Sequence, residues 1–156
     1  MKTILVQVGK STNKLFAEAT ADYTERTNHY MPFETLTIPE LKNTRNISHE
    51  QQKQAEGLLI MKHLQAADWV VLLDERGKTM SSTAFARWIE QKQLSGRRLL
   101  FVIGGPYGFS EDVYQRADEL LSLSAMTFSH QMVRLVFAEQ MYRACTIIKG
   151  EQYHHE

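Results

Sequence analysis

Five short apolar or β-branched segments alternate with longer helical patterns along this 156-residue chain. The short segments are typical of strands and cover residues 3–8, 33–38, 69–73, 99–103 and, more weakly, 120–123. Helical patterns follow them at 13–27, 48–66 and 81–93, in a short acidic helix from Ser110, and at 131–149. This alternation predicts an α/β fold whose mostly parallel sheet is covered by helices on both faces.

The length and composition favour a globular chain with one domain over residues 1–156. Apolar residues make up 43% and charged residues 23%, which excludes disordered and collagen-like classes. The longest apolar runs have five residues, whereas about 20 are needed to cross a bilayer, so we expect no membrane segment. The lone Cys145 cannot form an internal disulfide, and its apolar surroundings predict a buried, unreactive thiol in a reducing cytoplasm.

The charge balance excludes a general attraction to nucleic acid. Lys plus Arg number 18 and Asp plus Glu also number 18, so an RNA partner must be held by a local patch. One candidate patch has an excess of positive charge, although a solvated helix face is an alternative; it combines Arg87, Lys92, Arg97 and Arg98 with Glu90. The six histidines show no metal-ligand spacing, so we predict no metal site.

The last helical pattern is apolar around too much of its circumference for one stripe facing a sheet. A second subunit would bury the remainder, so we predict a two-fold homodimer. Arg134 and Arg143 stand out in this pattern, because a buried guanidinium needs a partner. Glu139 lies four residues before Arg143 and can pair with it on one face of the helix.

A binding site is expected where the predicted strands end, because ligands of open α/β sheets bind beyond the carboxyl ends of the strands. The segments there are 74–78, 104–108 and 124–130. Gly104-Gly105-Pro106 can cup an adenine or ribose through main-chain groups, but it matches neither a dinucleotide fingerprint nor a phosphate loop. A structural turn is the alternative. Asp74 and Glu75 are adjacent on an extended strand and point apart, which favours a capping or solvated role over acid–base work.

The C-terminal segment 150–156 contains Tyr153 and two imidazoles, His154 and His155. It is either a frayed terminus or, if it docks into a pocket, an RNA contact or a proton acceptor.

Taken together in this order, the motifs resemble the RlmH-type family of bacterial ribosomal large-subunit pseudouridine methyltransferases, in the SPOUT superfamily. The resemblance covers essentially the whole chain. It is carried by Leu73-Asp74 with Gly77-Lys78, Ile103-Gly104-Gly105-Pro106-x-Gly108, the stretch Leu121-Ser122-Leu123-Ser124-Ala125-Met126-Thr127 followed by His130 and Arg134, Glu139-Gln140-x-Tyr142-Arg143-Ala144, and Tyr153-His154.

The resemblance implies a deep trefoil knot in the C-terminal part of the α/β fold. It also implies S-adenosyl-L-methionine as cofactor, held in a bent shape by Leu73, Gly104, Leu123, Ser124, Ala125, Met126, Thr127 and Phe128. The implied reaction is methylation of N3 of a pseudouridine in the 23S rRNA of the assembled 70S ribosome. The neutral charge balance favours such a composite surface over protein-free RNA.

For the catalytic groups, we hypothesise that Tyr153 and His154 of one subunit complete the pocket of the other, with Arg143 orienting the tail or the RNA at the interface. Two alternatives stay open at this point. One is a non-catalytic, nucleotide-binding regulatory dimer of flavodoxin-like topology that uses the same glycine loops. The other is a SPOUT methyltransferase that acts on tRNA.

Overall fold

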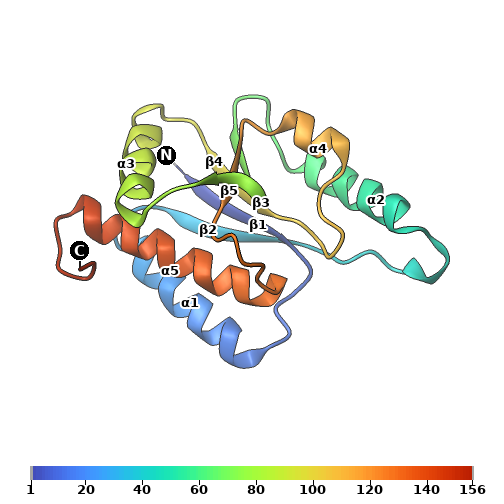
Figure 1. Cartoon of the computed structure of the whole chain (residues 1–156), viewed down its shortest axis with the longest axis horizontal. Helices are drawn as coiled ribbons and strands as arrows, with labels where there is room; N and C mark the ends of the chain where they lie inside the picture. The colour runs from blue at the N-terminus through green and yellow to red at the C-terminus, as the bar shows by residue number, and fades with distance from the viewer. Residues whose placement is uncertain (1, 156) are drawn as a thin grey trace.

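Five parallel strands form one sheet in the computed structural model, which describes residues 2–155 (Figure 1). The strands are β1 (Thr3–Val8), β2 (Phe33–Ile38), β3 (Trp69–Thr79), β4 (Leu99–Ile103) and β5 (Glu119–Ser122), in the spatial order β2-β1-β4-β3-β5. The helices are α1 (Lys14–Asn28), α2 (His49–Lys62), α3 (Ser82–Leu94), α4 (Glu111–Arg116) and α5 (His130–Ile148), with a 3-10 turn η1 (Thr44–Asn46). The predicted α/β architecture is confirmed. Met1 and Glu156, the ends of the predicted domain, lie outside the described residues.

The sheet is buried on both faces, which explains the continuous apolar runs of its central strands. Every residue of β1 and β4 is buried. Alternate residues face opposite cores: Leu5 and Phe101 pack with side chains of α3 and α5, while Val6 and Val102 pack with side chains of α2 and α4. The α1 helix lies alongside α5 (Figure 1). Helices therefore cover both faces, as predicted.

Polar N-caps fix where the helices begin. At Ser48, where the helical pattern 48–66 begins, the hydroxyl accepts the Gln51 N–H at 3.1 Å, and the Gln51 side chain accepts the Ser48 N–H at 2.9 Å. The same helix ends at Lys62, so its predicted extension to residue 66 is wrong. The chain turns there because the Asp68 carboxylate accepts the Gln65 N–H at 2.7 Å.

The third strand is longer than its apolar run predicts. It continues from Leu73 to Thr79 across a register irregularity, and both Leu73 and Lys78 are paired with Leu121 of β5. Gly77 makes this approach possible, since a Cβ there would lie 2.6 Å from the backbone nitrogen of Leu121. Residues 74–78 are therefore strand, and the predicted loop at this position is wrong.

Arg134 anchors the start of α5 to the segment after β1. Its side chain is 1% exposed and donates to the Val8 carbonyl at 2.8 Å and to the Ser11 hydroxyl at 3.1 Å. The partner that a buried guanidinium needs is thus supplied by two neutral oxygens. The Nε of Arg134 has no partner among residues 2–155. Burial lowers the pKa of Arg134.

The predicted positive patch is largely neutralised by internal contacts. Arg98 pairs with the buried Asp68 at 2.7 Å, Arg97 donates to the Ala67 carbonyl at 2.6 Å, and the Lys92 ammonium lies 3.7 Å from the ring centroid of Trp69. These cations hold the amino ends of the strands together, which argues against a docking role for them.

Two further sequence expectations concern buried and membrane-spanning segments. Cys145 is buried, and burial raises the pKa of its thiol to about 11, which agrees with an unreactive side chain. Within residues 2–155, none of the helices has the length and apolar character needed to cross a membrane.

Candidate functional site

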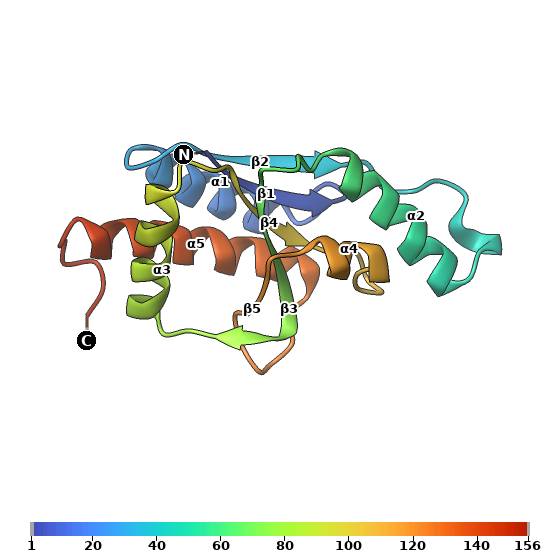
Figure 2. The same cartoon turned by 90° about the horizontal axis from the view of Figure 1, so that it is seen from above.

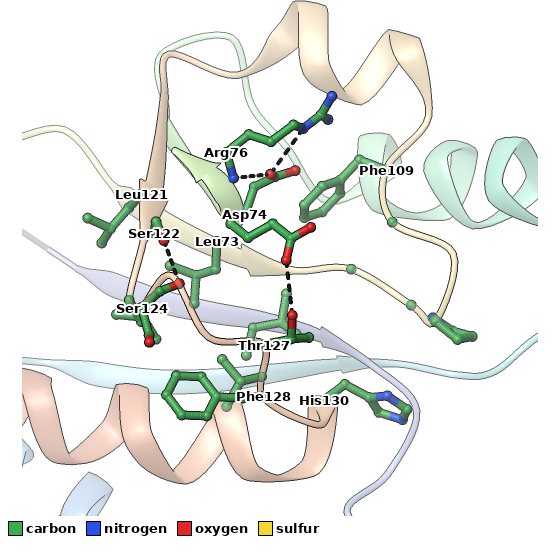
Figure 3. A pocket seen from close by; sticks show the side chains of 18 of the residues that line it. Leu73, Asp74, Arg76, Phe109, Leu121, Ser122, Ser124, Thr127, Phe128 and His130 are labelled. Carbon is green, nitrogen blue, oxygen red and sulfur yellow. Dashed lines mark hydrogen bonds and ion pairs between the residues drawn. The ribbon is translucent and has the colours of Figure 1, made fainter. Parts of the chain in front are cut away.

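Three segments far apart in the sequence line one cavity of about 590 Å³ at the carboxyl ends of β4, β3 and β5 (Figure 3). They are the end of β3, the glycine-rich loop after β4 and the turn after β5. The glycine-rich loop and the Ser-Ala-Met-Thr turn therefore lie side by side, as the strand-end argument predicts. Of the predicted cofactor positions, all except Ala125 line the cavity: Leu73, Gly104, Leu123, Ser124, Met126, Thr127 and Phe128. Ala125 is exposed on the same turn.

Short polar side chains hold the turn after β5 in place. The Ser122 hydroxyl donates to the Ser124 carbonyl at 2.9 Å, and the Ser124 hydroxyl accepts the Met126 N–H at 2.9 Å. Thr127 donates to the Glu75 carboxylate at 3.1 Å, which ties the turn to β3 (Figure 3). Ser129 then caps α5. The turn is thus fixed on the cavity wall by its own sequence.

Close packing explains the two glycines after β4. A Cβ at Gly104 would lie 3.1 Å from the ring of Phe109, and one at Gly105 would lie 2.4 Å from Oε1 of Glu56. The loop closes on itself, since the Gly108 N–H donates to the Gly105 carbonyl at 3.1 Å with Gly108 at φ +85°. Limited space therefore favours glycine at positions 104 and 105, and the positive φ favours it at position 108.

Glu56 is a functional candidate that sequence reasoning missed. It lies on α2 beneath the glycine-rich loop, is 4% exposed, and its Oε1 has no hydrogen-bond partner within residues 2–155. Gln52 donates to its other oxygen at 3.4 Å. Burial raises the pKa of Glu56. The one signal in the sequence is the neighbouring Gly57, a glycine inside a helix, which lets the loop at Ser110 pack against α2.

Asp74 and Glu75 contact different partners, so they do not form an acid–base pair. Asp74 accepts hydrogen bonds from the Tyr114 hydroxyl and, at 2.8 Å, from the Arg76 N–H. Burial acts to raise the pKa of Asp74, but these hydrogen bonds outweigh it and lower the pKa below its usual range. Glu75 is exposed, as expected, whereas the Asp74 side chain is only 10% exposed. For Asp74 the capping role is therefore confirmed by its bond to the Arg76 N–H, and the solvated role is wrong because Tyr114 covers the carboxylate.

The predicted catalytic side chains form a second cluster at the C-terminal end of α5. The Glu139 carboxylate accepts from Arg143 at 2.5 Å and from the Tyr153 hydroxyl at 2.9 Å. Arg143 also lies 3.1 Å from Nδ1 of His154 and stacks over the Tyr153 ring at 4.7 Å. Burial, with Glu139 nearby, raises the pKa of Tyr153, so its hydroxyl stays protonated. The frayed-terminus alternative is wrong for these residues.

The cavity and the C-terminal cluster lie at opposite ends of α5. His130 and Val133 line the cavity, while Arg143 lies ten residues after Val133, about 15 Å further along the helix axis. In Figure 2 the segment that follows α5 lies beside the C-terminal end of the helix, away from the end of β5. Tyr153 and His154 are not among the residues that line the cavity of their own chain.

Comparison with known proteins decides the family. Residues 1–154 match the family model described as "Predicted SPOUT methyltransferase". The chain belongs to the SPOUT methyltransferase family. Relatives named "Ribosomal RNA large subunit methyltransferase H" match it over 100% of both chains, at 56% identity in Bacteroides fragilis, 54% in Parabacteroides distasonis and 50% in Flavobacterium johnsoniae. The resemblance inferred from the motifs is confirmed, and the trefoil knot it implies stays a prediction.

The cavity of this SPOUT methyltransferase fits the cofactor that the family generally uses, S-adenosylmethionine. Leu73, Leu123 and Phe128 supply apolar walls for an adenine ring. Gly104 and Gly105 line the cavity without side chains, so a ligand there would meet their main chain. No group of three or more His, Cys, Asp or Glu side chains within residues 2–155 is arranged to hold a metal ion.

Replacing Glu56 by Gln should change how stability depends on pH. A carboxyl whose pKa is raised by folding binds its proton more tightly in the folded chain, so wild-type stability falls as pH rises from about 4 through the folded pKa. Glu56→Gln removes this loss, and its free energy of unfolding relative to wild type should rise between pH 4 and pH 8 in urea titrations. Glu90→Gln, at an exposed position, controls for net charge. A pH-independent difference for Glu56→Gln would contradict this account.

Proposed function

We propose that this protein is an S-adenosyl-L-methionine-dependent methyltransferase that modifies N3 of a pseudouridine in the 23S rRNA of the 70S ribosome. The observation that carries the proposal is that the glycine-rich loop and the turn after β5 line the same cavity in a chain of the SPOUT family. The relatives named as large-subunit rRNA methyltransferases support the substrate class. This substrate implies a cytoplasmic location.

The cavity residues would bind and orient the cofactor. Leu73, Leu123 and Phe128 would flank the adenine, and the main chain of the glycine-rich loop would approach it closely. When bound, S-adenosylmethionine would supply an electrophilic methyl group that N3 of the base can accept, with the neutral thioether S-adenosylhomocysteine as the leaving group and the N3 proton lost to a base. The protein then contributes alignment and stabilisation of the anion that forms at the base.

Stabilisation of the anion at the base can come from the C-terminal cluster, which contains Arg143, Tyr153 and His154. The guanidinium of Arg143 can stabilise negative charge on a deprotonated imide, and the imidazole of His154 is the candidate base for the N3 proton. Tyr153, protonated and held by Glu139, fixes the tail over the guanidinium. These groups lie far from the cavity of their own chain, so they act only if a second chain brings them there.

A two-fold homodimer would supply that second chain. Met132, Leu135 and Val136 on α5 are only partly buried in the monomer, and Leu15 on the neighbouring α1 is 74% exposed. Burial of this apolar surface favours pairing of two copies through α1 and α5. The tail of one copy would then complete the cavity of the other.

Transfer of labelled methyl groups tests the substrate assignment. We expect incorporation into 23S rRNA of intact 70S ribosomes that lack the modification, and little into protein-free 23S rRNA, because the chain carries no net positive charge to bind free RNA. Equal rates on both RNAs would contradict the dependence on the assembled particle. Incorporation into tRNA instead would identify a tRNA enzyme, and saturable cofactor binding without any transfer would favour a regulatory dimer.

Mixing two inactive variants tests the shared site. Leu123→Arg should block the cavity, and deletion of residues 152–156 should abolish transfer while leaving cofactor affinity intact. Random exchange of subunits makes half of the dimers mixed, each with one complete site, so activity should return to about a quarter of the wild-type value. If sedimentation shows mixed dimers but activity does not return, the tail acts on its own subunit or not at all.

A further inference from the structure

An exposed aromatic pair lies at the rim of the cavity. Tyr107 belongs to the glycine-rich loop, lines the cavity and is 41% exposed. Its ring stacks on that of His49, the first residue of α2, with centroids 3.8 Å apart and planes inclined by 16°. The stack joins the loop to α2 and leaves an aromatic surface open to solvent. The roles assigned above to the cofactor site and to the C-terminal cluster use neither of these two side chains.

Two cations without partners lie in the segment that leads into this helix. Lys42 and Arg45 are exposed and make no hydrogen bond or ion pair with any residue in the range 2–155. The nearby Glu50 is engaged by Lys53 at 3.0 Å, which leaves the charges of Lys42 and Arg45 uncompensated by it. This differs from the Arg97 and Arg98 region, where acidic groups and carbonyls already bind the cations.

We propose that Tyr107, stacked on His49, is a platform for an unpaired base of the RNA substrate, and that Lys42 and Arg45 contact phosphates of the same strand. The proposal rests on the proposed function and adds to it a surface that holds a nucleotide beside the methylated one. Single-stranded RNA is bound by aromatic faces that stack on bases together with cations that follow the backbone. Both elements are present here, and Tyr107 is only three residues from Gly104 of the cofactor cavity.

The partner subunit's tail is a weaker occupant of this surface. The one carboxylate among residues 150–155, that of Glu151, already accepts a hydrogen bond from the Tyr30 hydroxyl at 2.8 Å, so the tail offers little negative charge to two free cations. A polyanionic strand matches Lys42 and Arg45 better.

Methyl transfer to 70S ribosomes by Tyr107→Ala tests the platform. Loss of one stacked base should raise the KM for ribosomes at least about fivefold, with kcat at saturating ribosomes and the dissociation constant of S-adenosylmethionine within about twofold of wild type. Tyr107→Phe retains the ring and should retain the wild-type KM. A matching loss of ribosome affinity in a filter-binding assay gives a readout that is independent of turnover.

The phosphate contacts have their own test. Lys42→Ala combined with Arg45→Ala should raise the KM for ribosomes and make its dependence on salt concentration less steep. Lys62→Ala removes one exposed positive charge from the other end of α2 and should leave both quantities unchanged.

Other outcomes separate the platform from the proposed function. If the wild-type protein methylates ribosomes and Tyr107→Ala has the wild-type KM, the platform is wrong and the function stands. If Tyr107→Ala weakens cofactor binding or dissociates the dimer, Tyr107 serves the cofactor or the subunit contact, and the platform is again wrong. If the wild-type protein transfers no methyl group to any ribosome, the proposed function itself fails, and the platform with it.

Discussion

The site depends on close approach of backbones at one edge of a parallel sheet. Because β4, β3 and β5 run in the same direction, their carboxyl ends bring three distant segments together. This approach needs a glycine at position 77, where a Cβ would lie 2.6 Å from the backbone nitrogen of Leu121 in β5. A larger side chain there would separate two walls of the cavity. Gly77 therefore has a structural role, whereas Gly104 and Gly105 present only main-chain atoms to the cavity.

The α5 helix connects the cavity and the C-terminal cluster and also keeps them apart. Its first turn borders the cavity, Arg134 ties it to the segment after β1, and its last turns hold Arg143 and the C-terminal residues. Nineteen residues of helix make a rigid spacer, so the tail cannot fold back onto its own cavity without breaking the cluster around Glu139. This rigidity is the physical reason why the proposed reaction needs two chains.

Much of the fold could be predicted from the sequence because the signals are local. The bounds of β1, β2 and β4 match their apolar runs, and Ser48 with Gln51 marks the start of α2. The extension of β3 to Thr79 could not be predicted, since it depends on contact between Gly77 and β5, which are far apart in the sequence. In the site, strand ends indicated the glycine-rich loop, but Glu56 and the Tyr107–His49 stack depend on how α2 packs against that loop.

The central claim is that the cavity at the carboxyl edge of the sheet binds S-adenosylmethionine. Calorimetric titration of the purified protein with S-adenosylmethionine, a flavin and NAD tests it most directly. The account predicts saturable binding of S-adenosylmethionine alone, with about one molecule per chain. Binding of the flavin or NAD in its place, or no binding of S-adenosylmethionine at millimolar concentration, would contradict it.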